Sequence, residues 1–300
     1  MILVGGENLI DFIEAADGRF TAKLGGCPYN IAKTLARQGQ SVGYLTPIST
    51  DAMGARLAAD LLADGVQLLA PRSQSPTSLA LVSLVNGQPS YQFYRQKTAE
   101  RRVTAPLLNK IIPKHPTAFQ LGSLALTSGK DADVWAQIYR AVHQRGVFTA
   151  LDPNIRPAFI KNRRKYMARL GWILPKTDLL KLSNEDLAWL APKRAPCAAA
   201  AHLRQKYKIP LVVMTMGTAG AKAFTEQGNF SIKAPKAEPF VDAIGAGDTF
   251  MGTLLAQLSK AGLLAREALQ DAGEAELRAI LKTAAKAAAV NCQASGCNPP

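Results

Sequence analysis

The residues best suited to chemistry are a run of small residues that precedes an aspartate in the segment 241–250. The small residues are Gly245, Ala246 and Gly247, and an apolar stretch typical of a helix follows them. At a helix start the first backbone N–H groups have no intrahelical partner and the helix dipole is positive, so bare amides can hold an anion. Small side chains leave that approach open. The pattern therefore predicts an anion site at a helix N-terminus.

The aspartate of this segment, Asp248, falls in the first turn of the predicted helix, beside the anion site. There its carboxylate could take a proton from a hydroxyl group while the hydroxyl oxygen attacks phosphorus. Phosphoryl transfer depends mostly on positioning and on charge stabilisation, and such a site offers both. Taken alone, a Gly-Ala-Gly-Asp run is more often a helix-capping aspartate after a glycine turn, because short motifs recur by chance.

Short polar and small residues near the N-terminus could bind a sugar. A sugar carries many hydroxyl groups, so its pocket needs short carboxylate and amide side chains and backbone that can come close. Those residues are Asp11, Gly25, Gly26 and Asn30. Each has another interpretation, as a strand-end charge, a turn or an early-helix polar residue, but their order before a helix favours the pocket.

The elements that must position these residues follow an alternating pattern. Short β-branched runs alternate with amphipathic helical stretches, which is typical of parallel strands joined by crossover helices. Helices are predicted over 28–38, where Pro28 suits a first turn and Gly39 a left-handed cap, and over 51–65, with Asp51 as N-cap. The predicted strands are 1–5, 42–48, 117–122, 147–152, 178–182 and 210–216.

One segment breaks the alternation. Two strand-like runs, 77–85 and 89–95, flank Asn86 and Gly87, a strong hairpin signal. With the extended stretch 10–22 they predict a small separate sheet, which could cover a site, pair with another subunit or have no role. No repeat or linker divides the chain, so we expect one α/β domain over 1–300 with a lid formed by about 10–22 and 77–100.

Composition narrows the class of protein. The chain has 300 residues, of which 48% are hydrophobic, enough for a full core. No apolar run approaches the roughly 20 residues of a membrane-spanning helix, and the first residues do not fit a signal peptide, so we expect a cytoplasmic protein without a membrane partner. The four cysteines lack paired metal-ligand spacing, so neither a zinc site nor a disulfide framework is predicted.

The net charge of +14 is the unusual bulk property. It fits a nucleic-acid partner, an anionic substrate or a solvated basic surface. The densest basic cluster, within 161–169, lacks the interleaved aromatic residues on which single strands stack, so we expect no nucleic-acid partner. A nucleotide triphosphate would also be attracted by this charge.

Two motifs resemble signatures of one known family. The segment 242–250 is similar to the C-terminal signature of the ribokinase-like (PfkB) carbohydrate kinases, and 24–32 is similar to their N-terminal double-glycine motif. The two occur in the family's order. Further segments extend the resemblance. Residues 6–11 resemble the family's opening strand, 93–95 with 98–99 resemble the fructokinase lid, and 152–156 resemble a fructokinase-like motif. Residues 215–217 with Gly220 resemble the nucleotide loop, and 289–296 resemble the stretch near the adenine and a monovalent cation.

The resemblance implies a ribokinase-like three-layer α/β/α sandwich with a mostly parallel sheet and a small β-sheet lid. It implies transfer of the ATP γ-phosphoryl group to a sugar hydroxymethyl group, with D-fructose as leading substrate, Mg²⁺ as cofactor and K⁺ as a candidate second cation. Asp248 would be the base and Gly245, Ala246 and Gly247 the anion hole, with Arg156 assisting. Further sugar contacts would be Asp11, Gly25, Gly26, Asn30, Tyr94, Arg95 and Asn154, and nucleotide contacts Lys181, Thr215, Gly217, Gly220 and Ala289.

The sequence departs from the family pattern after Lys181. An Asn-x-x-Glu motif linked to magnesium is expected there, and 183–186 reads Ser-Asn-Glu-Asp instead. Glu185 or Asp186 could act through metal-bound water. Neither a Gly-x-x-x-x-Gly-Lys-Ser/Thr phosphate loop nor a dinucleotide turn is present, so the anion hole remains the best phosphate site.

Three alternatives stay open. One is another substrate within the family, such as 2-keto-3-deoxygluconate, ribose or a nucleoside. A second is a non-catalytic basic protein, nucleic-acid-binding or regulatory, that keeps the kinase fold. The third concerns assembly: edge strands and aromatic residues in the lid could support a homodimer.

Overall fold

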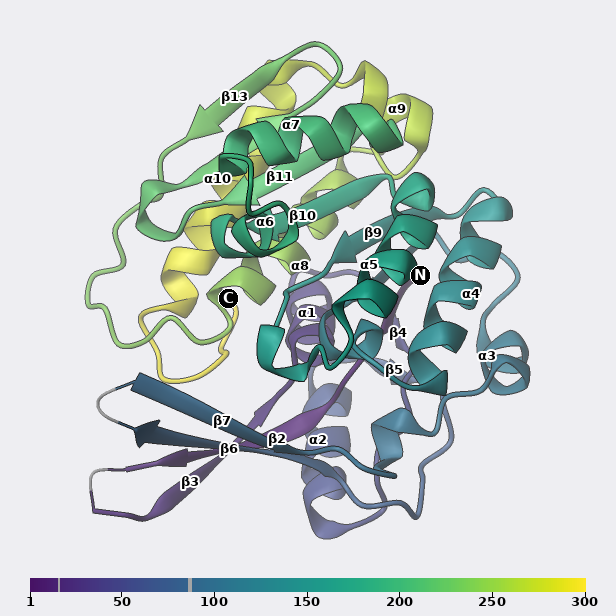
Figure 1. Ribbon diagram of the computed structural model, residues 1–300, viewed down its shortest axis with the longest axis vertical. Helices are drawn as coiled ribbons and strands as arrows, with labels where there is room; N and C mark the ends of the chain where they lie inside the picture. The colour runs from purple at the N-terminus through teal and green to yellow at the C-terminus, as the bar shows by residue number, and fades with distance from the viewer. Residues whose placement is uncertain (16, 86–87) are drawn as a thin grey trace.

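The computed structural model describes residues 1–15, 17–85 and 88–300, which form two sheets (Figure 1). The large sheet has the strand order β13-β12-β11-β10-β9-β8-β1-β4-β5, and the small one has the order β3-β2-β6-β7. In the large sheet β12 is antiparallel to both neighbours, and the other adjacent strands are parallel. The predicted α/β fold with a mostly parallel sheet and a lid sheet is confirmed.

Six strands of the large sheet lie close to predicted positions, whereas β5, β12 and β13 were not predicted. The strand predicted over 42–48 ends early, at Tyr44, and Pro47, which has no N–H to donate, lies in the loop that follows. The bounds are β1 (Ile2–Gly5), β4 (Val42–Tyr44), β5 (Gln67–Leu68), β8 (Ala118–Gly122), β9 (Phe148–Asp152), β10 (Leu179–Ser183), β11 (Leu211–Thr215), β12 (Ala221–Phe224) and β13 (Asn229–Ile232).

Helices cover both faces of this sheet, as two separate buried clusters show. Successive strand residues point to opposite faces, so Ile2 and Val4 join one cluster and Leu3 the other. The first cluster is covered by α1 (Cys27–Arg37), α2 (Ala52–Ala63), α8 (Ala246–Lys260), α9 (Arg266–Asp271) and α10 (Glu274–Asn291). The second is covered by α3 (Ala105–Ile111), α4 (Lys130–Gln144), α5 (Arg163–Ile173), α6 (Asn184–Leu190) and α7 (Pro196–Tyr207).

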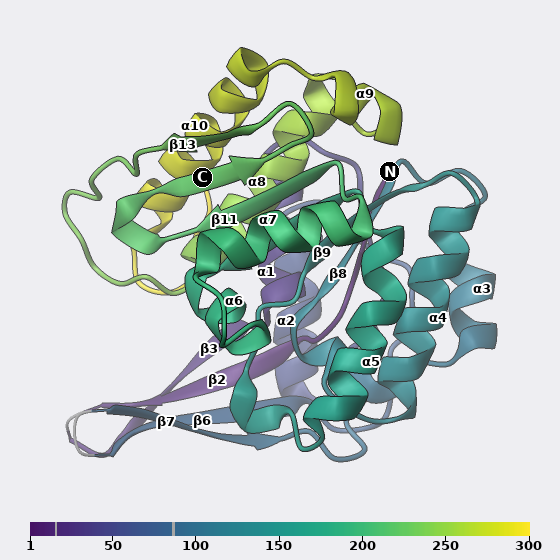
Figure 2. The ribbon, with the colours of Figure 1, turned by 45° about the horizontal axis from the view of Figure 1, so that its top comes forward.

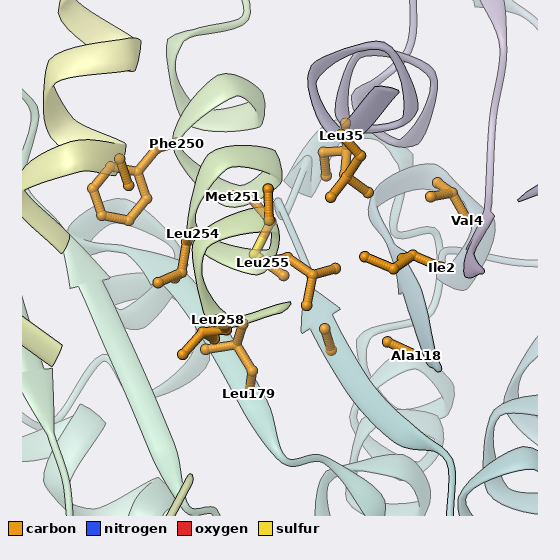
Figure 3. Packing of buried hydrophobic residues seen from close by; sticks show 14 of the residues in the cluster. Ile2, Val4, Leu35, Ala118, Leu179, Phe250, Met251, Leu254, Leu255 and Leu258 are labelled. Carbon is orange, nitrogen blue, oxygen red and sulfur yellow. The ribbon is translucent and has the colours of Figure 1, made fainter. Parts of the chain in front are cut away.

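Packing against the sheet fixes the position of α8. Figure 3 shows Leu255 and Leu258 pointing from this helix toward the strands, where Ile2 and Leu179 lie. Each fully buried leucine stabilises the fold by about 1.5–3 kcal/mol. Gly252 lets α1 approach, since a Cβ there would lie 2.6 Å from the Thr34 Cβ. The two helices therefore pack closely, with both N-termini at the carboxyl edge of the sheet.

The small sheet extends away from the large one in both views (Figures 1 and 2). Its strands are β2 (Leu9–Glu14), β3 (Phe20–Gly25), β6 (Ser78–Val85) and β7 (Gln88–Tyr94). The stretch predicted as extended over 10–22 is thus an antiparallel pair, β2 and β3, while β2 and β6 pair in parallel. The predicted turn at Asn86 and Gly87 lies outside the described residues. No helix of the described chain is long and apolar enough to cross a membrane.

Candidate active site

The first turn of α8 lies where the sequence predicts an anion site. Gly245 is its N-cap, with φ 75° and ψ 0°, a left-handed conformation that favours glycine. A Cβ there would also lie within 2.4 Å of the Cys297 Sγ. Within the described chain, the N–H groups of Gly247 and Asp248 have no acceptor. These two amides therefore point their positive ends at the space that an anion would occupy.

The carboxylate of Asp248 is held by a residue from the other helix. Asn30 in α1 donates from Nδ2 to Oδ2 of Asp248 at 2.7 Å, and the aspartate is 8% exposed. The Oδ1 of Asn30 is buried and has no hydrogen-bond partner among the described residues. Asn30 was predicted to contact the sugar; the structure gives it the further task of orienting the aspartate.

Asp11 faces Asp248 from the lid. It lies in β2 opposite Lys23 of β3, and its side chain reaches toward Gly25, where a Cβ would come within 2.5 Å of the Asp11 Oδ2. Burial, and after it the charge of Asp248, raise the pKa of Asp11 to about 6, while the charge of Arg156 acts in the opposite direction. Asp248 and Arg156 are therefore close enough to Asp11 for their charges to act on its carboxylate.

Gly26 joins the lid strand β3 to α1. Its φ is 117°, and a Cβ would lie 2.6 Å from the carbonyl oxygen of Glu7. Any side chain here would be strained and would collide with backbone. The double glycine thus serves two purposes: Gly25 makes room for Asp11, and Gly26 lets α1 begin close to β1.

A buried ion pair lies beneath the anion site. The Nζ of Lys181 in β10 is 2.8 Å from Oδ2 of Asp152 at the end of β9, and both side chains are almost fully buried. Burial alone would lower the pKa of Lys181, but Asp152 beside it raises the pKa, so the ammonium group stays charged. A Cβ on Gly247 would lie 3.2 Å from this Nζ. Lys181, predicted to contact the nucleotide, adds positive charge under the helix start.

Asp152 was not predicted as a site residue, although its segment had been noted. The available signal was its place at the end of a predicted parallel strand, because ligands of open α/β sheets bind beyond the carboxyl ends of the strands. Glu7, at the end of β1, was missed in the same way. Its Oε1 accepts a hydrogen bond from the N–H of Cys27 at 3.2 Å, and burial raises its pKa to about 7.

A groove of about 480 Å³ opens on the other side of the anion site. The predicted nucleotide residues Thr215, Gly217, Gly220 and Ala289 line it, together with Ala246 and Gly247. Aromatic and sulfur-bearing residues of this groove were not foreseen from the sequence; these are Phe240, Phe250 and Cys292. An adenine needs apolar walls and the triphosphate needs amides, and the groove offers both.

Tyr94 and Arg95, the two lid residues predicted to contact the sugar, make other contacts in this structure, and their role in sugar binding stays a prediction. Asp11 pairs with Ala80 and Ala80 with Phe93, so these three residues share one face of the lid. Tyr94 follows Phe93 and therefore points to the opposite face of the lid, where it is 55% exposed.

The side chain of Arg95 is held by an ion pair with Glu100. It is 8% exposed, with its Nε 2.9 Å from Oε1 of Glu100, and it donates to the carbonyl oxygen of Leu124 at 3.4 Å. It therefore ties the base of the lid to the large sheet.

The loop after β9 carries the next two predicted residues. Asn154 adopts a φ of 40°, which is unusual for a residue with a side chain. Arg156 is exposed, and its Nη1 donates to the carbonyl oxygen of Ile155 at 3.3 Å. Its charge acts on Asp11, so its guanidinium can reach an anion at the same space.

The two carboxylates predicted to hold magnesium, Asp186 and Glu185, differ in their burial and in their hydrogen bonds. Asp186 is buried and forms a capping box with Ser183, while its Oδ1 accepts the N–H of Ile155 at 2.7 Å. Both of its oxygens thus accept hydrogen bonds from backbone N–H groups, which gives Asp186 a structural task. Glu185 is exposed in the first turn of α6 and remains the carboxylate of this pair that fits a water-mediated magnesium contact.

The chain's last residues brace the loop before α8. Asn291 donates from Nδ2 to the carbonyl oxygen of Ile244 at 2.7 Å, and the N–H of Gly296 donates to Oδ2 of Asp242 at 2.9 Å. These contacts fix the geometry of the anion site from the side predicted to lie near a monovalent cation.

The entire chain, residues 1–300, matches the sequence profile described as pfkB family carbohydrate kinase. The protein belongs to this family. It is 34% identical over 287 residues to a fructokinase of Rhizobium leguminosarum bv. trifolii, an alignment that covers 93% of this chain and 86% of the relative. The resemblance inferred from the sequence is therefore confirmed, and the protein is a carbohydrate kinase of fructokinase-like type.

Solved structures agree with this assignment. The crystal structure of a fructokinase with bound ATP from Xylella fastidiosa has a TM-score of 0.88 and 25% identity, and covers 99% of this chain and 93% of its own. An aminoimidazole riboside kinase from Salmonella enterica, complexed with aminoimidazole riboside and an ATP analogue, has a TM-score of 0.84 at 21% identity, with 99% and 94% covered. The second likeness is one of fold.

Proposed function

We propose that this carbohydrate kinase transfers the γ-phosphoryl group of ATP to a hydroxymethyl oxygen of a ketose, with D-fructose yielding fructose 6-phosphate. The observation that carries the proposal is the position of Asp248. Its carboxylate is buried in the first turn of α8 and raises the pKa of the lid carboxylate Asp11, and the neighbouring Gly247 lines the groove. A hydroxyl held there would have a base on one side and a phosphate site on the other. The fructokinase relative and the ATP bound to its Xylella counterpart support the substrate pair.

In the proposed step, a sugar hydroxyl gives its proton to Asp248 while its oxygen bonds to the γ-phosphorus. The bond from that phosphorus to the bridging oxygen breaks, and ADP leaves with the electron pair. The amides of Gly247 and Asp248, the buried charge of Lys181 and the guanidinium of Arg156 would stabilise the charge that spreads over the phosphoryl oxygens. Asn30 would hold the base in place.

The remaining contacts follow from this arrangement. Asp11 would accept hydrogen bonds from sugar hydroxyls, and Gly25 and Gly26 would allow that approach, with Asn154 bordering the pocket. Mg²⁺ bound to the ATP phosphates would neutralise part of their charge, and Glu185 would hold it through water. K⁺ near 289–296 stays a prediction.

The lid would close over the sugar and exclude water, which is the competing acceptor. Its outer face carries exposed Phe20 and Tyr94, and these residues support the proposed homodimer through the lid. Light scattering of the full chain tests that assembly: a mass of one chain would count against it.

A riboside is the second candidate substrate, and the Salmonella structure favours it because that kinase binds aminoimidazole riboside. The test is ADP release from Mg-ATP with D-fructose, ribose, 2-keto-3-deoxygluconate, adenosine and aminoimidazole riboside. The proposal expects the highest kcat/KM with fructose and a phosphorylated hydroxymethyl group in the product. Highest kcat/KM with a riboside would replace fructose, and no turnover with any acceptor would favour the non-catalytic alternative.

A further inference from the structure

We propose that a borderline-soft divalent cation such as Zn²⁺ binds to Cys27, Asp152 and Asp248, and that the bound ion blocks the base. The inhibition rests on the proposed function of Asp248, whereas the binding site does not. The Sγ of Cys27 and one oxygen from each carboxylate lie within 4.8 Å of one another, and all three residues are buried. The sequence spacing predicted no zinc site, because the three residues come from distant segments.

Three elements converge to make this cluster. Cys27 begins α1, Asp152 ends β9, and Asp248 lies in the first turn of α8. Asp152 is fully buried, and while its Oδ2 is held by Lys181, its Oδ1 has no hydrogen-bond partner within the described chain. A buried polar atom left unpaired costs about 1–3 kcal/mol. A metal ion would satisfy that oxygen.

The donor set selects the kind of ion. One thiolate and two carboxylates suit Zn²⁺, whereas Mg²⁺ prefers oxygen ligands in octahedral geometry. Ligands about 2.0–2.3 Å from a tetrahedral ion lie about 3.5 Å apart, so these side chains would need to move inward by roughly 1 Å. Three protein ligands leave one position for water.

The charges also balance. Binding releases the Cys27 thiol proton to solvent, so the cluster would hold one thiolate and two carboxylates beside the ammonium group of Lys181. The resulting net charge of about −2 matches a divalent cation. The carboxylate of Asp248 would then be coordinated and unable to accept a proton from the sugar, so the ion and the sugar should compete.

The binding test uses Co²⁺ as a probe, added to the resting full-length protein without sugar or nucleotide. We expect thiolate-to-cobalt charge-transfer absorption that is displaced by Zn²⁺, absent in Cys27→Ala, and retained in the matched variant Cys197→Ala, whose thiol is exposed and far along the chain. Cys27→Ser serves the same purpose if the alanine variant folds poorly. Absorption that persists without the Cys27 thiol, or is missing from the unaltered protein, would overturn the site.

The inhibition test measures ADP directly by chromatography, because coupling enzymes could respond to zinc. Cys27→Ala should raise the Zn²⁺ concentration for half-inhibition by about a hundredfold or more, since loss of even an outer-shell partner costs 10–100-fold in affinity. Inhibition should weaken as the sugar concentration rises. Equal inhibition of both proteins, or competition with Mg-ATP alone, would overturn the proposed block. If no sugar is turned over, the cobalt spectrum still decides whether the site exists.

Discussion

Gly25→Ala should separate sugar binding from stability. The added Cβ would lie 2.5 Å from the Asp11 Oδ2, whereas ordinary contacts begin at 3.4 Å, so the carboxylate must move by about 0.9 Å. Gly25 does not have a left-handed φ, and the atom that must move belongs to a side chain. The fold should therefore tolerate the methyl group, while the sugar should lose a well-placed acceptor.

The expected loss follows from that displacement. A hydrogen bond to a charged group contributes about 1.5–3 kcal/mol, which corresponds to roughly 10- to 150-fold in kcat/KM. The assay is sugar-dependent ADP release, with KM for the sugar and for Mg-ATP measured separately. The sugar parameters should change and the nucleotide KM should not. Gly171→Ala is the matched control, because its Cβ would lie 4.0 Å from the Tyr207 hydroxyl, and it should leave activity unaltered.

A double-mutant cycle shows whether the effect passes through Asp11. In the Asp11→Ala background, Gly25→Ala should cause little further loss, because the carboxylate that the new methyl group displaces is absent. Unchanged sugar kinetics in Gly25→Ala, or full additivity of the two changes, would refute the placement of Asp11 against the sugar.

The remaining predictions concern two other contacts of the site. The pKa of Asp11 is raised to about 6 from 3.8, so the KM for the sugar should rise as the pH falls through 6, and Asp11→Asn should flatten this profile. Because the pKa of Asp11 is higher in the folded than in the unfolded chain, the ionised carboxylate destabilises the fold at neutral pH. Asp11→Asn should therefore increase the free energy of unfolding by up to about 3 kcal/mol at pH 7.5, and should not increase it below pH 4. A decrease at pH 7.5 would contradict this. Asp186→Ala should lower the free energy of unfolding, measured in urea titrations, by about 2–4 kcal/mol, because the helix cap is lost and the N–H of Ile155 is left unpaired. Glu185→Ala should change the free energy of unfolding by no more than about 0.5 kcal/mol and should instead raise the Mg²⁺ concentration that activity requires. Equal stability of these two variants would contradict the contrast.

The sequence indicates those parts of the candidate site that depend on local geometry. An anion site at 245–247 follows from small residues before a helix, and the double glycine follows from the need for close approach. The capping box of Ser183 and Asp186 was also readable, as a Ser-x-x-Asp pattern, but the comparison with a magnesium motif hid it.

Long-range pairing could not be foreseen in the same way. Asp152 lies opposite Lys181 because β9 and β10 pair with Ala150 against Leu179, and this register is not visible in either segment alone. The face on which Tyr94 lies depends on the register of the lid strands, where a shift of one residue would exchange the two faces. The ion pair of Arg95 with Glu100 likewise depends on how the chain turns after β7.

The most direct test of the account compares sugar-dependent ADP release by the unaltered kinase and by Asp248→Asn, with circular dichroism and thermal unfolding measured on both. If Asp248 is the base, the variant should keep its fold and lose at least about a hundredfold in kcat. A folded Asp248→Asn protein with nearly full turnover would contradict the assignment of the base.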